Sequence, residues 1–308
     1  MNFNDFTDYV AEKVTDIMGE EYTHSISKVT KNNNIVLTGL SVRKEGERIS
    51  PTVYLEDFYK MYEDGSVIGD VISEIAKCFK DHELISPPDI SYIEDFEKVR
   101  EKLMLKAVNY SKNETFLLTV PHKRFLDLAC IFYIYLSGEE FGNGSITVTN
   151  EWMKIWGIDE DTLYETAFKN TRERLGFTLD SITEVLKDLL PFTAGGVPEC
   201  EKTISEALDH TEDIPMYVLS NPSRHFGASC ILFNEVLSDF ATDISSDLFI
   251  LPSSVHELII VPDNGEDPRM LHQMVKEVNS TQVCAQEVLS DNIYRFRRNT
   301  QELEALYA

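Results

Sequence analysis

Hydrophobic and polar positions follow two different periods in the first part of the chain. Over residues 6–17, apolar side chains recur every three or four positions, which predicts an amphipathic helix with Asn4 or Asp5 as its cap. Residues 22–29 and 35–42 favour strands, and the polar run between them suits a hairpin turn. We therefore expect a helix followed by a β-hairpin.

A short strand and a long helical stretch complete this part of the sequence. Residues 51–55 favour a strand, and helical spacing follows over residues 57–80 with an interruption near Gly65. The pair Pro87 and Pro88 is typical of a boundary, because proline cannot continue a helix or an inner strand. We expect a first lobe to end there.

The middle of the chain combines one strongly apolar strand with several helices. Residues 124–136 are rich in apolar and aromatic side chains and predict a strand covered on both faces. Helices are predicted to begin at Asn150 and Asp159, whose side chains can serve as caps. Ser181 and Glu184 have the spacing of a capping box, which predicts a further helix after them.

The last third of the sequence contains strands of different lengths and one well-marked helix. Residues 216–220 and 228–233 favour short strands, and residues 248–261 favour one long apolar strand. A helix is predicted to begin at Pro268, because proline is tolerated in the first turn. Its inner face is expected to carry three apolar residues, Met270, Met274 and Val278.

The order of these elements predicts the fold class. Strands that come in pairs and are followed by helices indicate an α+β protein with mostly antiparallel strands, in two or three closely packed lobes. A chain of 308 residues is long for a single core, which fits this division. We place an N-terminal α+β lobe at residues 1–86, a middle one at residues 87–198 and a C-terminal one at residues 199–308.

Acidic residues exceed basic residues throughout the chain. The 53 Asp and Glu residues and 28 Lys and Arg residues give a formal net charge of −25, and the densest cationic group is Arg295, Arg297 and Arg298. Nucleic acids and anionic membranes are bound by clustered positive charge, so we expect neither as a direct partner. The charge favours solubility, and an acidic surface that mimics a nucleic acid is a weaker alternative.

The sequence shows no signal for secretion or for membrane insertion. The residues after Met1 form neither a basic nor an apolar segment, and the longest apolar run, residues 128–136, is far shorter than the roughly 20 residues of a membrane helix. The five cysteines are widely separated and form no CxxC pair, which is typical of reduced thiols. We expect a cytoplasmic protein without a membrane partner.

The most unusual local string is the segment 252–257, which lies within the predicted long strand. In one interpretation His256 is a general base, Ser253 or Ser254 is a nucleophile, and Glu257 assists, which would make the protein a hydrolase. In the other, these side chains satisfy one another in a core network, because unpaired polar groups are costly to bury. The structural interpretation is favoured, since adjacency in sequence is a weak guide to catalytic geometry.

A second polar string joins two predicted strands at residues 221–227. Asn221, Arg224 and His225 bring an amide, a guanidinium and an imidazole into one loop, and loops often carry binding sites. Arg224 can hold a carboxylate or a phosphate. The alternative, given equal weight, is a polar loop in which Gly227 meets the needs of a turn.

Trp152 and Trp156 lie four residues apart on one face of a predicted helix. If exposed, such a pair would anchor a protein partner. Aromatic side chains at this spacing more often pack in a core, so core packing is the favoured interpretation. The two tryptophans are nevertheless candidates for partner binding.

Eight strings spread along nearly the whole chain carry a resemblance to a known family. They are residues 34–40, 51–55, 121–128, 149–151, 156–158, 251–257, 277–279 and 288–294. On these strings the chain resembles an uncharacterised family of clostridial-type bacteria that is known only as a domain of unknown function. The resemblance implies a bacterial cytoplasmic protein and brings no activity, cofactor or catalytic residue with it.

Standard cofactor and metal signatures are missing from the sequence. The motifs HExxH, CxxC, GxGxxG, GxSxG and the P-loop are all absent, so we expect no cofactor and no metal. A non-catalytic protein that binds a protein or peptide is therefore the leading hypothesis. A hydrolase built on the segment 252–257 is the alternative, and nothing in the sequence fixes the oligomeric state.

Overall fold

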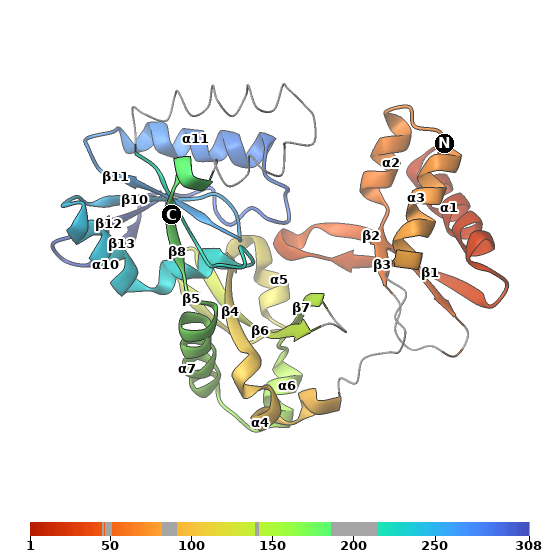
Figure 1. Ribbon diagram of the computed structural model, residues 1–308, viewed down its shortest axis with the longest axis horizontal. Coiled ribbons are helices and arrows are strands. Elements are labelled where there is room, and N and C mark those ends of the chain that lie inside the picture. Colours follow the sequence, from red (N-terminus) through yellow and green to blue (C-terminus); the bar gives the residue numbers. More distant parts are fainter. Residues whose placement is uncertain (45, 47–50, 82–90, 139–141, 186–214, 308) are drawn as a thin grey trace. The chain divides into compact units, whose positions relative to one another are not determined.

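The chain divides into two compact units, Met1–Ile90 and Ser91–Ala308, each with its own buried apolar side chains. The computed structural model in Figure 1 describes residues 1–44, 46, 51–81, 91–138, 142–185 and 215–307. Every strand pair in these residues is antiparallel, and both units contain helices, which confirms the predicted α+β class.

The first unit is a three-stranded sheet packed against helices. Its main elements are α1 (Phe3–Met18), β1 (Tyr22–Thr30), β2 (Val36–Lys44), β3 (Thr52–Tyr54), α2 (Glu56–Glu63) and α3 (Ile68–Asp81). The strands follow one another in the order β1-β2-β3. Phe6, Val10 and Val14 of α1 share a fully buried core with Leu40 of β2 and Ile75 of α3. The predicted helix and hairpin are thus confirmed.

Breaks between these elements fall where residues adopt positive φ. Asn33 and Asn34, in the turn between β1 and β2, have φ of 62° and 56°. Gly65, between α2 and α3, has φ of 101°. Asparagine and glycine are the residues that tolerate this conformation best, so the predicted turn and the predicted helix break have the same physical cause.

Two details of the first helix differ from the prediction. The side chain of Asn2, and not that of Asn4 or Asp5, caps α1 by accepting a hydrogen bond from the main-chain nitrogen of Asp5. Ile17 was expected on the inner face but is 46% exposed, because the buried face of α1 ends at Val14.

The second unit begins with a four-stranded sheet. Its elements are α4 (Phe96–Val99), β4 (Leu103–Asn109), α5 (Glu114–Leu117), β5 (His122–Phe125), β6 (Leu128–Gly138), β7 (Gly142–Thr147), α6 (Asn150–Trp156) and α7 (Glu160–Asn170). β6 pairs with β4, β5 and β7. The single strand predicted over residues 124–136 is wrong, because a turn at Leu126 and Asp127, with φ of 56° at Leu126, separates β5 from β6.

Capping side chains at the helix starts were predicted with mixed success. Asp159 caps α7 as expected, but α6 is capped by Thr149 and Asn150 is its first residue. Ser181 and Glu184 exchange the side-chain to main-chain hydrogen bonds of a capping box. Residues 182–185 are helical, as predicted after this box, and the rest of the predicted helix lies outside the described residues.

A six-stranded sheet forms the rest of the second unit, in the order β13-β12-β10-β11-β9-β8. Its elements are β8 (Thr178–Ser181), β9 (Tyr217–Ser220), the 3-10 helix η6 (Gly227–Leu232), α10 (Asn234–Asp243), β10 (Leu248–Pro252), β11 (Leu258–Pro262), α11 (Pro268–Thr281), β12 (Tyr294–Arg297) and β13 (Glu302–Ala305). On one face, Leu248 and Ile250 pack with η6 and α10. On the other, Phe249 and Leu251 pack with α11.

Two strand predictions in this sheet are wrong. Residues 248–261 form the hairpin of β10 and β11, with a turn at residues 253–257. Apolar residues continue on both sides of the turn, so their pattern did not reveal the reversal of the chain. Residues 228–233 lie mainly in a 3-10 helix, because four consecutive side chains from Ala228 to Ile231 are buried and strand alternation is lost.

The start of α11 was predicted correctly, but its orientation was not. Asp267 caps the helix and Pro268 opens it. Its buried face consists of Leu271, Val275 and Asn279. The residues predicted to face inward are exposed: Met270 by 72%, Met274 by 42% and Val278 by 39%. The two rows are one position apart, so apolar spacing alone could not decide which of them faces the sheet.

One core joins the two sheets of the second unit. Leu128 of β6 lies in the same buried cluster as Ile250 of β10. In addition, Asp127 accepts hydrogen bonds from the hydroxyls of Tyr294 at 2.8 Å and Ser290 at 2.6 Å.

The two units differ in extent from the three predicted lobes. The described residues of the lobes predicted at 87–198 and 199–308 lie in the unit Ser91–Ala308, and those of the lobe predicted at 1–86 lie in the unit Met1–Ile90. Both predicted boundaries fall outside the described residues.

Candidate functional site

The two polar strings identified in the sequence lie next to each other. The loop 221–227 follows β9, and the turn 253–257 joins β10 to β11. Because β9 and β11 are antiparallel partners with Leu219 opposite Leu258, the end of β9 lies beside the start of β11. The sheet therefore brings both strings to the same end, a proximity that the sequence did not predict.

Three hydrogen bonds join the turn to Phe226 of the loop and to Ser220 and Ala228, which flank the loop. The main-chain N–H of Phe226 donates to Nδ1 of His256 at 3.2 Å, and that of Ala228 donates to the carbonyl of Val255 at 3.3 Å. The hydroxyl of Ser220 donates to the carbonyl of His256 at 2.7 Å. Two of the three bonds thus end on His256.

Ring contacts strengthen the same junction. The rings of Phe226 and His256 are nearly parallel, at 11° and 5.7 Å between centroids, and the His225 ring lies 5.6 Å from that of His256. From β4, Lys106 places its Nζ 4.4 Å from the centroid of Phe226. The ring of Tyr133, on β6, packs against that of Phe226 in a T-shaped arrangement, with 5.3 Å between the ring centroids.

The carboxylate that contacts the His256 ring is that of Glu287. Its Oε1 lies 3.8 Å from Nε2 of His256, and its main-chain carbonyl accepts the N–H of Val255 at 2.8 Å. Because Nδ1 accepts the N–H of Phe226, the neutral ring carries its proton on Nε2, toward Glu287. We call this group the histidine cluster: Lys106, His225, Phe226, His256 and Glu287.

Sequence reasoning missed Glu287 as a partner of His256. It named Glu257 instead, because that residue is adjacent in the chain. Glu287 lies in an irregular segment between α11 and β12, and no local motif marks it. Only the folding of that segment over the β10–β11 turn brings it to the histidine.

The serines of the predicted catalytic set have other contacts. The Oγ of Ser254 accepts the main-chain N–H of His256 at 3.0 Å, and Ser253 lines a groove beside α11. The N–H of Ser254 donates to the carbonyl of Glu257 at 3.2 Å. Ser254 therefore contacts the main chain of His256 rather than its imidazole, which is not the arrangement of a nucleophile and its base.

Asn221 organises the loop in which it lies. Its side chain is 1% exposed, donates to the carbonyl of His225 at 2.9 Å, and accepts from the Ser223 hydroxyl at 2.8 Å and the His225 N–H at 3.2 Å. Arg224, by contrast, has an exposed side chain and a φ of 49°. Of the three candidate ligand-binding residues in the loop, Asn221 thus has a structural role.

The electrostatic surroundings keep His225 uncharged at neutral pH. Burial lowers the pKa of the His225 imidazole, and the charges of His256 and Lys106 lower it further. The histidine cluster therefore places two imidazoles and a carboxylate close together.

An apolar groove lies beside α11 on the other side of the same turn. It has a volume of about 120 Å³ and is lined mainly by the side chains of Met216, Leu251, Pro252, Ile259, Met274, Val275 and Val278, together with Ser253 and Asn279. Met274 and Val278 belong to both the groove and the exposed row on α11. The row and the groove therefore form one apolar surface.

Trp152 and Trp156 pack into the second unit. Their rings are stacked at 6.1 Å, and the indole N–H of Trp156 donates to the carbonyl of Ile93 at 2.8 Å. Phe96 contacts Trp156 at 5.9 Å between ring centroids. Both tryptophans are partly buried against the core that contains β6, which agrees with the core-packing interpretation.

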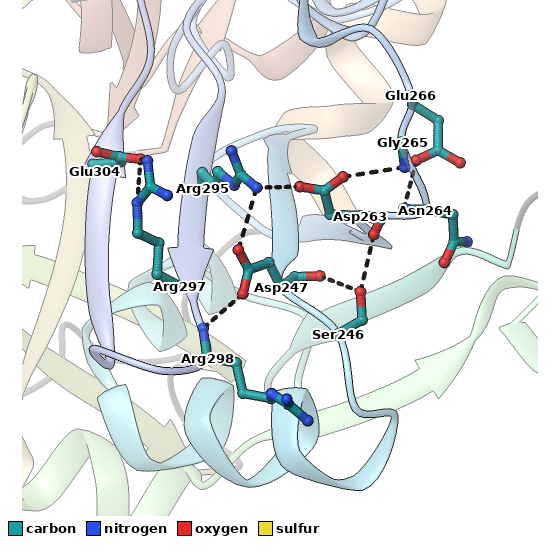
Figure 2. Close-up of polar contacts among 10 residues, drawn as sticks. All are labelled: Ser246, Asp247, Asp263, Asn264, Gly265, Glu266, Arg295, Arg297, Arg298 and Glu304. Carbon is teal, nitrogen blue, oxygen red and sulfur yellow. Dashed lines mark hydrogen bonds and ion pairs between the residues drawn. The ribbon is translucent and has the colours of Figure 1, made fainter.

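The cationic residues of β12 are paired with carboxylates (Figure 2). Arg295 contacts Asp247 at 3.2 Å and Asp263 at 2.6 Å, and Arg297 contacts a carboxylate of β13 at 2.6 Å. The main-chain N–H of Arg298 donates to Asp247 at 3.0 Å. Asp247 precedes β10 and Asp263 follows β11, so this ion cluster closes the hairpin at the end opposite the turn.

Two further observations concern metal ions and membranes. Among the described residues, no group of three or more His, Cys, Asp or Glu side chains is placed to hold a metal ion. In the same residues, no helix combines the length and the apolar character that a membrane crossing requires.

Comparison with known proteins places the chain in a family. The model of a family of unknown function, DUF5688, matches residues 3–298. A search of curated proteins and a search of solved structures found no match. All eight strings that carry the resemblance in the sequence lie within the matched residues. Because this match covers nearly the whole chain, the protein belongs to the DUF5688 family of unknown function.

Proposed function

We propose that the protein is a non-catalytic interaction protein that binds a protein or peptide segment along the outer face of α11. The observation that carries this proposal is the exposed apolar row of Met270, Met274 and Val278 beside the groove. Contiguous apolar surface of this kind on a soluble domain marks sites of interaction, whereas single exposed apolar residues do not.

The groove offers a place for one inserted side chain. Its volume of about 120 Å³ is close to that of an apolar cavity of about 150 Å³ that accepts a benzene molecule. Leu251 and Ile259 of the sheet and Met274 and Val278 of α11 supply apolar contacts. Met274 can adapt its shape to different occupants, because methionine is unbranched and flexible.

The row and the charge of the chain together define the expected partner. Apolar residues at i, i+4 and i+8 of a helix match the apolar face of an amphipathic helix. The net charge of −25 attracts positively charged segments and repels acidic ones. The proposed partner is therefore a basic amphipathic segment with one or two large apolar anchors.

A display library of random peptides, selected on the wild-type protein, tests this proposal. We expect the selected peptides to combine an apolar anchor with Lys or Arg, and to bind at least about tenfold more weakly to Met274→Glu. In protein labelled with ¹³C at the methionine methyl groups, the peptides should shift the signals of Met270, Met274 and Met216 most strongly.

A matched control uses an exposed apolar residue of the other unit. Val67 is 65% exposed, and Val67→Glu adds the same charge without changing α11. The proposal fails if the selected peptides bind wild type, Met274→Glu and Val67→Glu equally, or if the methyl shifts fall on other methionines. Circular dichroism and thermal unfolding establish that each variant is folded.

A further inference from the structure

The loop 221–227 is held in a conformation that depends on its contacts. Arg224 and Phe226 have φ of 49° and 55°, a region that residues other than glycine, asparagine and aspartate rarely adopt. Such conformations persist only where the surrounding structure holds them. The surrounding structure here comprises the hydrogen bonds of the Asn221 side chain within the loop, the side chains of Lys106 and Tyr133 against Phe226, and the turn 253–257. The contact between the turn and the main chain of Phe226 is the hydrogen bond to Nδ1 of His256.

That hydrogen bond requires an unprotonated Nδ1. A second proton on the His256 ring can only be added at Nδ1, because Nε2 carries the first one. The imidazolium would then present an N–H to the N–H of Phe226, and two donors cannot form a hydrogen bond. The imidazolium has another partner within reach, because Oε1 of Glu287 lies 3.8 Å from Nε2. Protonation therefore removes one contact of His256 and strengthens the other.

Other charged groups around the His256 ring also act on a positive charge there. His225 lies 5.6 Å away between ring centroids and Lys106 stands over Phe226, so both oppose a positive charge at the junction. Glu287 favours such a charge on its own side of the ring. Among titratable neighbours in the chain, Arg224 precedes His225 and Glu257 follows His256, while Tyr133 packs against Phe226.

We propose that the histidine cluster is a pH-sensitive latch, which holds the loop 221–227 against the turn 253–257 at neutral pH and releases it when the histidines become protonated. This inference stands independently of partner binding at α11, because it rests on different residues and contacts.

The stability of the latched junction is also expected to fall as the pH is lowered. The pKa of His225 is lowered in the folded protein, so the unfolded or released chain binds a proton more readily than the latched one. The latched state is therefore favoured above the ordinary histidine pKa of about 6.5, and it loses stability as the pH falls below that value. The loss ends once the pH is below the lowered pKa of the latched state.

Hydrogen–deuterium exchange of the full chain, read by mass spectrometry, tests the latch. Protection factors corrected for intrinsic exchange are measured at about pH 7.5 and about pH 5.5, on either side of the histidine range. We expect peptides that cover residues 221–229 to lose at least about tenfold in protection at the lower pH. Peptides from β10 serve as the internal reference and are expected to stay protected.

Three variants assign the effect to the cluster. In His256→Gln the side-chain oxygen can accept the N–H of Phe226 at both pH values, so the loop should stay protected at the lower pH. His225→Gln removes one opposing charge and should move the release to lower pH. His272→Gln changes a histidine that is stacked on Tyr307, outside the cluster, and should behave as wild type.

Two outcomes would overturn the proposal. The first is a wild-type loop that keeps its protection at the lower pH, a result that needs no variant to fold. The second is a His256→Gln protein that loses protection on acidification to the same extent as wild type. Loss of protection in β10 together with the loop would show general acid unfolding, which also contradicts a local latch.

Discussion

Gly227 lies where the loop, the end of β9 and the β10–β11 turn approach one another most closely. A Cβ at this position would clash with the hydroxyl of Ser220, and would lie 2.6 Å from the carbonyl oxygen of His256 and 2.7 Å from the main-chain nitrogen of Asn221. Two of these three atoms belong to the main chain and cannot move aside alone. The requirement for glycine here comes from space and not from an unusual φ.

Gly227→Ala is therefore expected to destabilise the second unit by about 1–3 kcal/mol, the usual range for overpacking. Urea unfolding measures the change. Gly69→Ala is the matched control, because a Cβ at Gly69 meets nothing within 4 Å and alanine favours a helix such as α3. Equal stability of Gly227→Ala and wild type would show that the junction is looser than described.

At the scale of single residues, the sequence identified some members of the cluster and not others. His225 and His256 were singled out because an imidazole stands out among apolar neighbours and within a polar loop. Glu287 and Lys106 were not, because each reaches the cluster only through tertiary structure. The role proposed for Ser254 rested on adjacency in the chain, whereas its hydroxyl contacts the main chain of His256.

At the scale of elements, the β10–β11 hairpin is fixed at both of its ends. The turn carries the histidine cluster, and the opposite end carries the ion cluster of Arg295, Asp247 and Asp263 (Figure 2). Asp263 has a side chain that is only 14% exposed, so its contact with Arg295 is largely shielded from water. Removing one partner of an ion pair in such a place costs more than it does at the surface, because the remaining charge is left partly buried without its partner.

Asp263→Asn should lower the free energy of unfolding by about 1–3 kcal/mol, because it leaves a partly buried guanidinium with one carboxylate instead of two. Glu304→Gln breaks the pair with Arg297, whose two side chains are 42% and 44% exposed, and should have a much smaller effect. Urea unfolding of both variants at low and high salt measures the difference. Similar losses for the two variants would contradict this view of the ion cluster.

Local signals explain which elements could be predicted. The helix α1, the β1–β2 hairpin and the start of α11 each carry their own cap, turn or periodicity within a few residues. The β5–β6 and β10–β11 turns contain Asp127 and the string Pro252, Ser253 and Ser254, which are turn residues, but they lack Gly and Asn. The apolar residues on both sides of each turn favoured one continuous strand, so the reversals were missed. The face that α11 buries was also beyond a local pattern, because apolar residues occur in both adjacent rows.

At the scale of the whole molecule, the first unit has a core to which, among the described residues, only those before position 81 contribute. Ile75 lies in that core and Ile250 in a core of the second unit, and both are fully buried. Two separate cores predict two unfolding transitions. Calorimetry should resolve them, and Ile75→Ala and Ile250→Ala, each costing about 2–5 kcal/mol, should each lower a different one.

A single transition that both variants shift together would show that the two units unfold as one.

The sequence predicted a boundary near Pro87 from its prolines, but it also predicted a third lobe, because strands and helices alternate again after residue 199. Side chains of β4, β6, β10 and β11 meet in one core. Contacts between such distant segments cannot be deduced from spacing along the chain.

The strand order of the six-stranded sheet also bears on how the protein is made. β10 pairs on one side with β11, its neighbour in sequence, and on the other with β12, which follows only after α11. During synthesis on the ribosome, the edge of β10 that pairs with β12 therefore has no partner strand until residues 294–297 have emerged. Exposed strands of this kind can pair with another chain, so the nascent protein is most prone to aggregate just before β12 appears. The strands and the core residues described for the first unit all precede residue 82, so they emerge much earlier.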